Sequence, residues 1–203
     1  MKTYGVILAA GESTRFDAEV NKLFYKVNGK ELVLYPVETF LESNEIDELI
    51  IVSSELNMTA LEDLLSEHQS VSMIVGGDSR QESEYCALQH LQNKATDNCL
   101  VAIHDAARSF ISTELLTSLV NTAKEFGSAA PYLDNSKFYD IENNNFVTKR
   151  KIVDIQTPQV YRYKELFECY SFQVLHFIIY IFILRVNYSK NTRSYSKGKI
   201  NDL

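Results

Sequence analysis

The N-terminal stretch YGVILAAGESTR, residues 4–15, contains the feature that decides the fold. Residues 6–9 are an uninterrupted apolar run, which predicts a strand buried on both faces, and small residues follow it at once. Similar short apolar runs recur along the chain, and segments whose apolar residues have helical spacing lie between them. Strands are predicted at 6–9, 49–52, 71–75 and 100–103, and helices at 32–41, 61–65, 82–91 and 112–126.

Strands that alternate with helices predict crossover connections, and therefore an α/β fold with a mainly parallel sheet. Sheets of this class bind ligands in the crevice beyond the carboxyl ends of their strands. Small and polar residues collect directly after three of the predicted strands, in segments 10–15, 76–80 and 104–108. We therefore expect the functional site at this end of the sheet.

The composition of the 203 residues is that of a globular protein with one substantial core. Hydrophobic residues make up 45% and charged residues 23%, which excludes a disordered chain, a collagen and a disulfide scaffold. Cys86, Cys99 and Cys169 include no close pair, so we expect reduced thiols. A net charge of −7 makes nucleic acid a poor partner. Since no secretory signal precedes residue 4, we expect a cytoplasmic protein.

Two segments break the alternating pattern. Residues 143–145 are three asparagines between short β-like runs, which predicts a projecting hairpin, or arm, at about 134–153. Because a two-stranded ribbon is marginally stable alone, we expect the arm to pack on a second copy in a homodimer. Residues 171–203 carry five Lys and Arg but one Asp, and include the apolar run 177–184. We interpret residues 1–170 as the main domain and 171–203 as an atypical apolar and basic tail.

A membrane anchor is the other interpretation of the run 177–184. Its eight apolar residues fall short of the ~20 that cross a bilayer. We therefore expect no membrane association, and instead a buried strand or an aggregation-prone segment.

The first candidate site lies after the first strand. Small residues there let a ligand approach backbone N–H groups, which can bind phosphate oxygens. Arg15 and Lys22 supply positive charge beside the loop. The spacing fits neither a Walker loop nor the three-glycine dinucleotide motif. A tight turn with solvated charges is the alternative.

Three further segments carry polar groups. In residues 76–83, GGDSRQES, the glycines can expose backbone groups to a base, although Ser79 or Ser83 would also serve simply as a helix cap. In residues 104–108, HDAAR, Asp105 can hold Mg²⁺ or a ribose hydroxyl, and Arg108 can bind a phosphate. His104 in that segment is more typical of a packed structural group than of a general base. Residues 156–159, QTPQ, are a polar turn if taken alone.

Together the segments LAAGESTRF, NKLF, GGDSRQES, HDAAR and QTPQ, in this order over residues 4–170, resemble cytidylyltransferases that activate sugar-alcohol phosphates. The resemblance is strongest to the 2-C-methyl-D-erythritol 4-phosphate cytidylyltransferase family of isoprenoid precursor synthesis. Ribitol-5-phosphate cytidylyltransferases are close relatives and the alternative. The resemblance implies a Rossmann-like nucleotide-diphospho-sugar transferase sheet whose projecting arm packs on a second subunit. It also implies a magnesium-dependent enzyme that transfers CMP from CTP to a polyol phosphate and releases pyrophosphate.

The resemblance also implies roles for individual residues. The catalytic cations would be Arg15 and Lys22. The nucleotide-binding positions would be Ala9, Ala10, Gly11, Gly77, Asp78, Arg80 and Ser83. The substrate-binding positions would be Asp105, Arg108, Asn135, Lys149 and Thr157, with Asp105 also a metal ligand.

The sequence departs from the family at several of these positions. Ser13 stands where the family usually has Gly, Asn135 where a Thr is expected, and Lys149 where an Arg is expected. The family continues beyond residue 170 into a strand with a substrate-facing Lys, and the tail here lacks it. We interpret the tail as a disrupted reading frame or a degenerated end. The remaining alternative is a catalytically impaired homologue that only binds CTP or dimerises.

Overall fold

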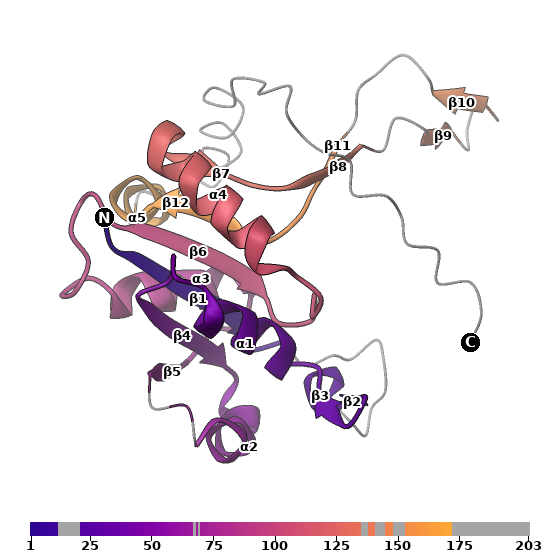
Figure 1. Cartoon of the computed structure of the whole chain (residues 1–203), viewed down its shortest axis with the longest axis vertical. Helices are drawn as coiled ribbons and strands as arrows, with labels where there is room; N and C mark the ends of the chain where they lie inside the picture. The colour runs from indigo at the N-terminus through magenta and orange to yellow at the C-terminus, as the bar shows by residue number, and fades with distance from the viewer. Residues whose placement is uncertain are drawn as a thin grey trace.

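The computed structural model describes residues 1–11, 21–66, 68, 70–134, 138–140, 145–147 and 153–171. Its centre is a six-stranded sheet with the order β5-β4-β1-β6-β12-β7 (Figure 1). The strands are β1 (Thr3–Ala9), β4 (Glu48–Ser53), β5 (Val71–Val75), β6 (Leu100–Asp105), β7 (Ser128–Ala129) and β12 (Gln159–Arg162). Strands β5, β4, β1 and β6 run parallel, and β12 runs antiparallel to both of its neighbours. The predicted α/β fold with a mainly parallel sheet is confirmed.

Five α-helices lie within the described residues and cover both faces of this sheet. They are α1 (Leu34–Glu42), α2 (Glu55–Leu65), α3 (Arg80–His90), α4 (Thr113–Phe126) and α5 (Tyr163–Ser171). Core residues of α1, α2 and α4 cluster with one face, and those of α3 and α5 with the other. The unbroken apolar runs follow from this arrangement, because Ile7 packs in the first cluster and its neighbour Val6 in the second.

The predicted helices are all present, but α2 begins at Glu55 instead of residue 61. Most residues of its first part are exposed, so the apolar spacing that reveals a helix is missing there. Helix α3 begins with a capping box, in which the Ser79 hydroxyl accepts from Glu82 N (3.1 Å) and the Glu82 carboxylate accepts from Ser79 N (3.0 Å). Ser79 therefore caps helix α3, which confirms the prediction that it could serve as a helix cap.

The arm consists of two antiparallel pairs that extend from the sheet (Figure 1). Strand β8 (Tyr132–Asp134) pairs with β11 (Val153–Ile155), and β9 (Phe138–Asp140) with β10 (Asn145–Val147). The boundaries at residues 134, 153 and 170 stay predictions, and residues 172–203 lie outside the described residues.

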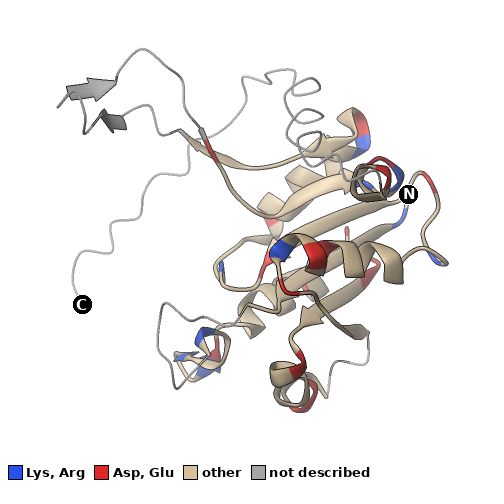
Figure 2. Cartoon of the chain, turned by 180° about the vertical axis from the view of Figure 1, so that it is seen from behind, with Lys and Arg blue, Asp and Glu red and all other residues tan. Residues whose placement is uncertain are grey.

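One small element was not predicted. The 3-10 helix η1 (Lys22–Phe24) leads into a hairpin of β2 (Lys26–Val27) and β3 (Lys30–Glu31). Its turn residues Asn28 and Gly29 both have positive φ, as a tight hairpin turn requires. Lys22, Lys26 and Lys30 lie in this segment, whereas the charged residues of α2 are all acidic (Figure 2).

Within the described part of the chain, no helix has both the length and the hydropathy needed to cross a bilayer.

Candidate functional site

The strand order reverses between β1 and β6, because β4 and β5 lie beyond β1 and β6 lies on its other side (Figure 1). A ligand crevice forms at such a switch point, outside the carboxyl ends of the strands. The segments after β1, β5 and β6 all lie at this end of the sheet. The structure therefore brings together segments 76–80 and 104–108 with residues 10 and 11 of the first segment; residues 12–15 lie outside the described residues.

Close packing joins the first two segments. A Cβ on Gly76 would lie 2.6 Å from the Ser83 hydroxyl and 3.1 Å from Ala10 Cβ. A Cβ on Gly77 would lie 2.3 Å from Glu82 Cβ. Both glycines are thus required by the close approach of the loop to α3. In contrast, among the described residues no atom lies within 4 Å of a Cβ built on Gly11.

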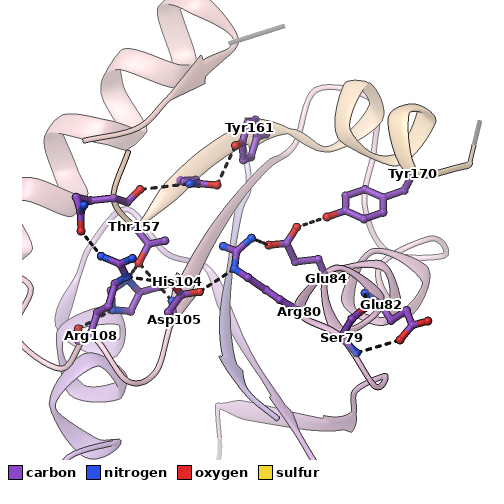
Figure 3. Close-up of polar contacts among 12 residues, drawn as sticks. Ser79, Arg80, Glu82, Glu84, His104, Asp105, Arg108, Thr157, Tyr161 and Tyr170 are labelled. Carbon is purple, nitrogen blue, oxygen red and sulfur yellow. Dashed lines mark hydrogen bonds and ion pairs between the residues drawn. The ribbon is translucent and has the colours of Figure 1, made fainter. Parts of the chain in front are cut away.

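Asp105, the last residue of β6, joins the second and third segments (Figure 3). Arg80 Nε donates to its Oδ1 (3.0 Å), and Arg108 Nε donates to its Oδ2 (3.1 Å). Arg108 also donates to the side-chain carbonyl of Gln156, in the fourth segment. Two guanidinium groups are therefore held side by side on one carboxylate.

His104 precedes Asp105 in β6 and is completely buried. Its Nε2 lies 3.0 Å from the Arg108 carbonyl oxygen, and its Nδ1 lies 2.9 Å from the Thr157 hydroxyl. Because a carbonyl can only accept, Nε2 carries the proton and Nδ1 accepts from Thr157. Burial lowers the pKa of His104 to about 4 despite the Arg108 carbonyl. The imidazole is therefore neutral at neutral pH and has the structural role predicted for it.

Thr157 connects His104 to the backbone N–H of Asp105. Its hydroxyl donates to His104 and accepts from Asp105 N at 3.4 Å. The hydroxyl is thus engaged within the protein, and its contribution to substrate binding stays a prediction.

The predicted nucleotide positions that the structure describes lie at the same end of the sheet, after β1 and β5 and in the first turns of α3. Ala9 is the buried end of β1, and Asp78 is exposed in the glycine loop. Ser83 is buried, and its hydroxyl donates to Gly77 O at 3.3 Å. Their roles toward a nucleotide stay predictions.

The lysine predicted to be catalytic lies at the far end of the first loop. Asn21 Nδ2 donates to Gly11 O (3.4 Å), and Asn21 Oδ1 accepts from Leu23 N (3.0 Å). These bonds hold Asn21, the residue before Lys22 and η1, against the carbonyl of Gly11. Arg15, Asn135 and Lys149 lie outside the described residues.

Three residues of the cluster were not predicted. Gln156 belongs to the QTPQ segment but was interpreted only as part of a turn. Glu84 lies one helical turn after Arg80, a spacing that allows an ion pair. Nothing in the sequence indicates that this glutamate is buried. Tyr170 on α5 donates to Glu84, and nothing in the sequence indicated this contact.

The donors at Asp105 do not fit a magnesium ion held by the protein. Both carboxylate oxygens accept from a guanidinium, and two positive charges at this distance disfavour a dication. Among the described residues, no group of three His, Cys, Asp or Glu side chains could hold a metal ion. The metal role of Asp105 stays a prediction that this geometry does not support.

Comparison with known proteins identifies the family. The family described as 2-C-methyl-D-erythritol 4-phosphate cytidylyltransferase matches residues 4–176. The relative of that name from Clostridium perfringens (strain SM101 / Type A) is 36% identical over 170 residues, which cover 80% of this chain and 74% of the relative. The one from Thermosipho africanus (strain TCF52B) is 35% identical over 167 residues, with the same coverage of 80% and 74%.

Solved structures show the same fold. The crystal structure of the Francisella tularensis enzyme of that name superposes with a TM-score of 0.70, over 89% of this chain and 81% of that chain, at 21% identity. Its likeness supports the fold alone, and the family match and the two relatives support membership. This chain belongs to the 2-C-methyl-D-erythritol 4-phosphate cytidylyltransferase family.

Proposed function

We propose that this chain transfers CMP from CTP to 2-C-methyl-D-erythritol 4-phosphate and releases pyrophosphate. One observation carries this proposal beyond family membership: Arg80 and Arg108 both bond to Asp105 at the carboxyl end of β6, beside the switch point of the sheet. An oxygen of the acceptor phosphate attacks the α-phosphorus of CTP, a P–O bond forms, and the bond to pyrophosphate breaks.

Both reactants are polyanions, so bringing them together is a large part of the barrier. The protein lowers this barrier by positioning the reactants and by placing cations that need no reorganisation. Asp105 provides such preorganisation, because it orients two guanidinium groups through their Nε atoms and leaves other N–H donors for anions. The acceptor is already an anion, so a general base is not required, in agreement with the buried neutral His104.

The test of this function is pyrophosphate release from CTP with 2-C-methyl-D-erythritol 4-phosphate, and in parallel with ribitol 5-phosphate. We expect turnover with the first acceptor and a CDP-linked product of the matching mass. Faster turnover with ribitol 5-phosphate would favour the alternative substrate. Thermal stabilisation by CTP without pyrophosphate would favour the impaired homologue. Adding EDTA to the same assay tests the proposed need for magnesium, which when bound would offset charge on the triphosphate.

Asp105→Asn is expected to lower kcat/KM for the acceptor by about tenfold to hundredfold, the range for losing a charge-assisted hydrogen bond. Arg80 and Arg108 donate to different oxygens of Asp105, and asparagine keeps only one of them, so its NH₂ group would face one of the two guanidinium groups. The cluster is partly exposed, so the midpoint of thermal unfolding should change little. Steady-state kinetics and thermal unfolding of the same preparation check this. Unchanged kinetics would contradict the orienting role of Asp105.

We further propose that the chain is a homodimer through the arm, and that it is cytoplasmic. Tyr132 and Leu133 on β8 and Ile155 on β11 are 42%, 51% and 40% exposed, an apolar surface suited to a second copy. Light scattering after size exclusion should report twice the chain mass. Leu133→Asp should yield monomers, whereas Leu56→Asp on α2, where the leucine is 86% exposed, should not. A monomeric parent protein would refute this proposal.

A further inference from the structure

Helix α3 contains a buried carboxylate that the proposed reaction does not use. Glu84 is only 5% exposed, although a glutamate is seldom buried unless it is paired. Its Oε1 forms an ion pair with Arg80, and its Oε2 accepts from the phenol of Tyr170 on α5. Figure 3 shows both partners directed at this carboxylate, on opposite sides. Burial raises the pKa of Glu84, and the contacts with Arg80 and Tyr170 act against that rise.

Arg80 connects Glu84 to Asp105. Its Nη1 pairs with Glu84 and its Nε donates to Asp105, so a carboxylate holds each side of the guanidinium. Burial alone would lower the pKa of Arg80, but the two carboxylates outweigh it and raise the pKa. The second oxygen of Asp105 holds Arg108. The contacts are therefore continuous from Tyr170 through Glu84, Arg80 and Asp105 to Arg108.

We propose that Glu84 is a positioning residue, which together with Tyr170 fixes Arg80 against Asp105 and so holds both site arginines in place before anionic substrates bind. An arginine side chain loses considerable rotamer freedom when it is ordered, and a cation contributes most where it is ordered in advance. Glu84 orders Arg80 in this way, because it holds the guanidinium at a second point in addition to Asp105. The inference rests on the proposed function only for its activity readout.

A purely structural role makes a different prediction. Glu84 and Tyr170 also join α3 to α5, where the rings of Tyr85 and Tyr170 stack with centroids 5.9 Å apart. If the carboxylate served only this packing, its loss would change stability and leave the order of Arg80 and the kinetics as they are.

Glu84→Gln separates these roles, because glutamine keeps the shape and a hydrogen-bond acceptor for Tyr170 but removes the charge. We expect kcat/KM to fall about tenfold, the effect of one lost charge-assisted bond, with little change in the midpoint of thermal unfolding. Tyr170→Phe keeps the stacked ring and should give a smaller fall. The control is Glu48→Gln, whose carboxylate pairs with Lys2 (2.5 Å) and Lys94 (3.8 Å) at the start of β4, at the other end of the strands. It should leave kcat/KM unchanged.

The decisive readout is the ¹⁵N NMR signal of the Arg80 Nε–H group, identified by its absence in Arg80→Gln. We expect an ordered, slowly exchanging signal in the parent protein and its broadening or loss in Glu84→Gln. In the Arg80→Gln background, Glu84→Gln should cause no further loss of kcat/KM, because it acts through Arg80. An unchanged Arg80 signal, or additive losses in the double variant, would overturn the inference. An inactive parent protein would refute the proposed function, while the NMR comparison would still decide the role of Glu84.

Discussion

Lys22→Ala is expected to lower kcat by about 10²–10³-fold, the cost of removing one preorganised group that stabilises transition-state charge. Its effect on CTP affinity should be much smaller, because the charge that it offsets grows mainly as the α-phosphorus is attacked. The structure supports this role through Asn21, which donates to Gly11 O (3.4 Å) and so places the start of η1 beside the end of β1. Steady-state kinetics and calorimetric titration with CTP measure the two quantities separately.

The matched control is Lys26→Ala, which removes a lysine four positions further along, in β2. Lys26 pairs with Glu31 at 3.1 Å, and its side chain is mostly exposed, so its loss should leave kcat unchanged. Arg15→Ala should behave like Lys22→Ala if the resemblance assigns it correctly. Equal losses in kcat and CTP affinity for Lys22→Ala would mean that the lysine serves binding in general, contrary to its catalytic role.

Acid is expected to destabilise the fold through His104 by about 3 kcal/mol between about pH 6.5 and about pH 4. The pKa of this buried histidine is lowered to about 4, whereas an unfolded histidine titrates near pH 6.5. Between these values the unfolded state binds more protons than the folded state, so lowering the pH favours unfolding. Above about pH 6.5 the histidine is neutral in both states, and its contribution stops depending on pH.

Urea unfolding of the parent protein and of His104→Gln across this pH range tests the prediction. Carboxylates also lose stabilising contacts in acid, but they do so in both proteins, so the difference between the two curves isolates the histidine. Glutamine can still donate to the Arg108 carbonyl, which limits the other effects of the substitution. Parallel curves with no difference in slope would show that His104 is not held neutral by the fold.

Three strands of the parallel sheet, β1, β4 and β6, could be predicted because each is buried on both faces, whereas β5 is only partly buried and was predicted from its apolar residues alone. Residues 6–9 and 49–52 are apolar without interruption, and each falls within a strand of the structure. Strand β12 was not predicted: it has four residues, only two of them buried, and its position between β6 and β7 depends on distant pairing. The two-residue β7 is too short to have any period.

The residues of the site could be predicted better than their contacts. Asp105, Arg80 and Arg108 were all candidates, but each was assigned to a ligand, and the structure shows them bound to one another. Arg80 and Asp105 are 25 positions apart, so their contact depends on the order of the strands in the sheet. The spacing of apolar residues predicts strands and helices but not that order. The burial of Glu84 likewise depends on α5, which packs over α3 from the far end of the described chain.

The most direct test of the central claim, a crevice that holds CTP while the acceptor phosphate attacks it, is the nucleotide preference of the parent protein. Initial rates of pyrophosphate release should be measured with CTP, UTP, ATP and GTP, each with 2-C-methyl-D-erythritol 4-phosphate. We predict a clear preference for CTP, with release that depends on the acceptor. Equal rates with all four nucleotides, or no binding of any of them, would contradict the account.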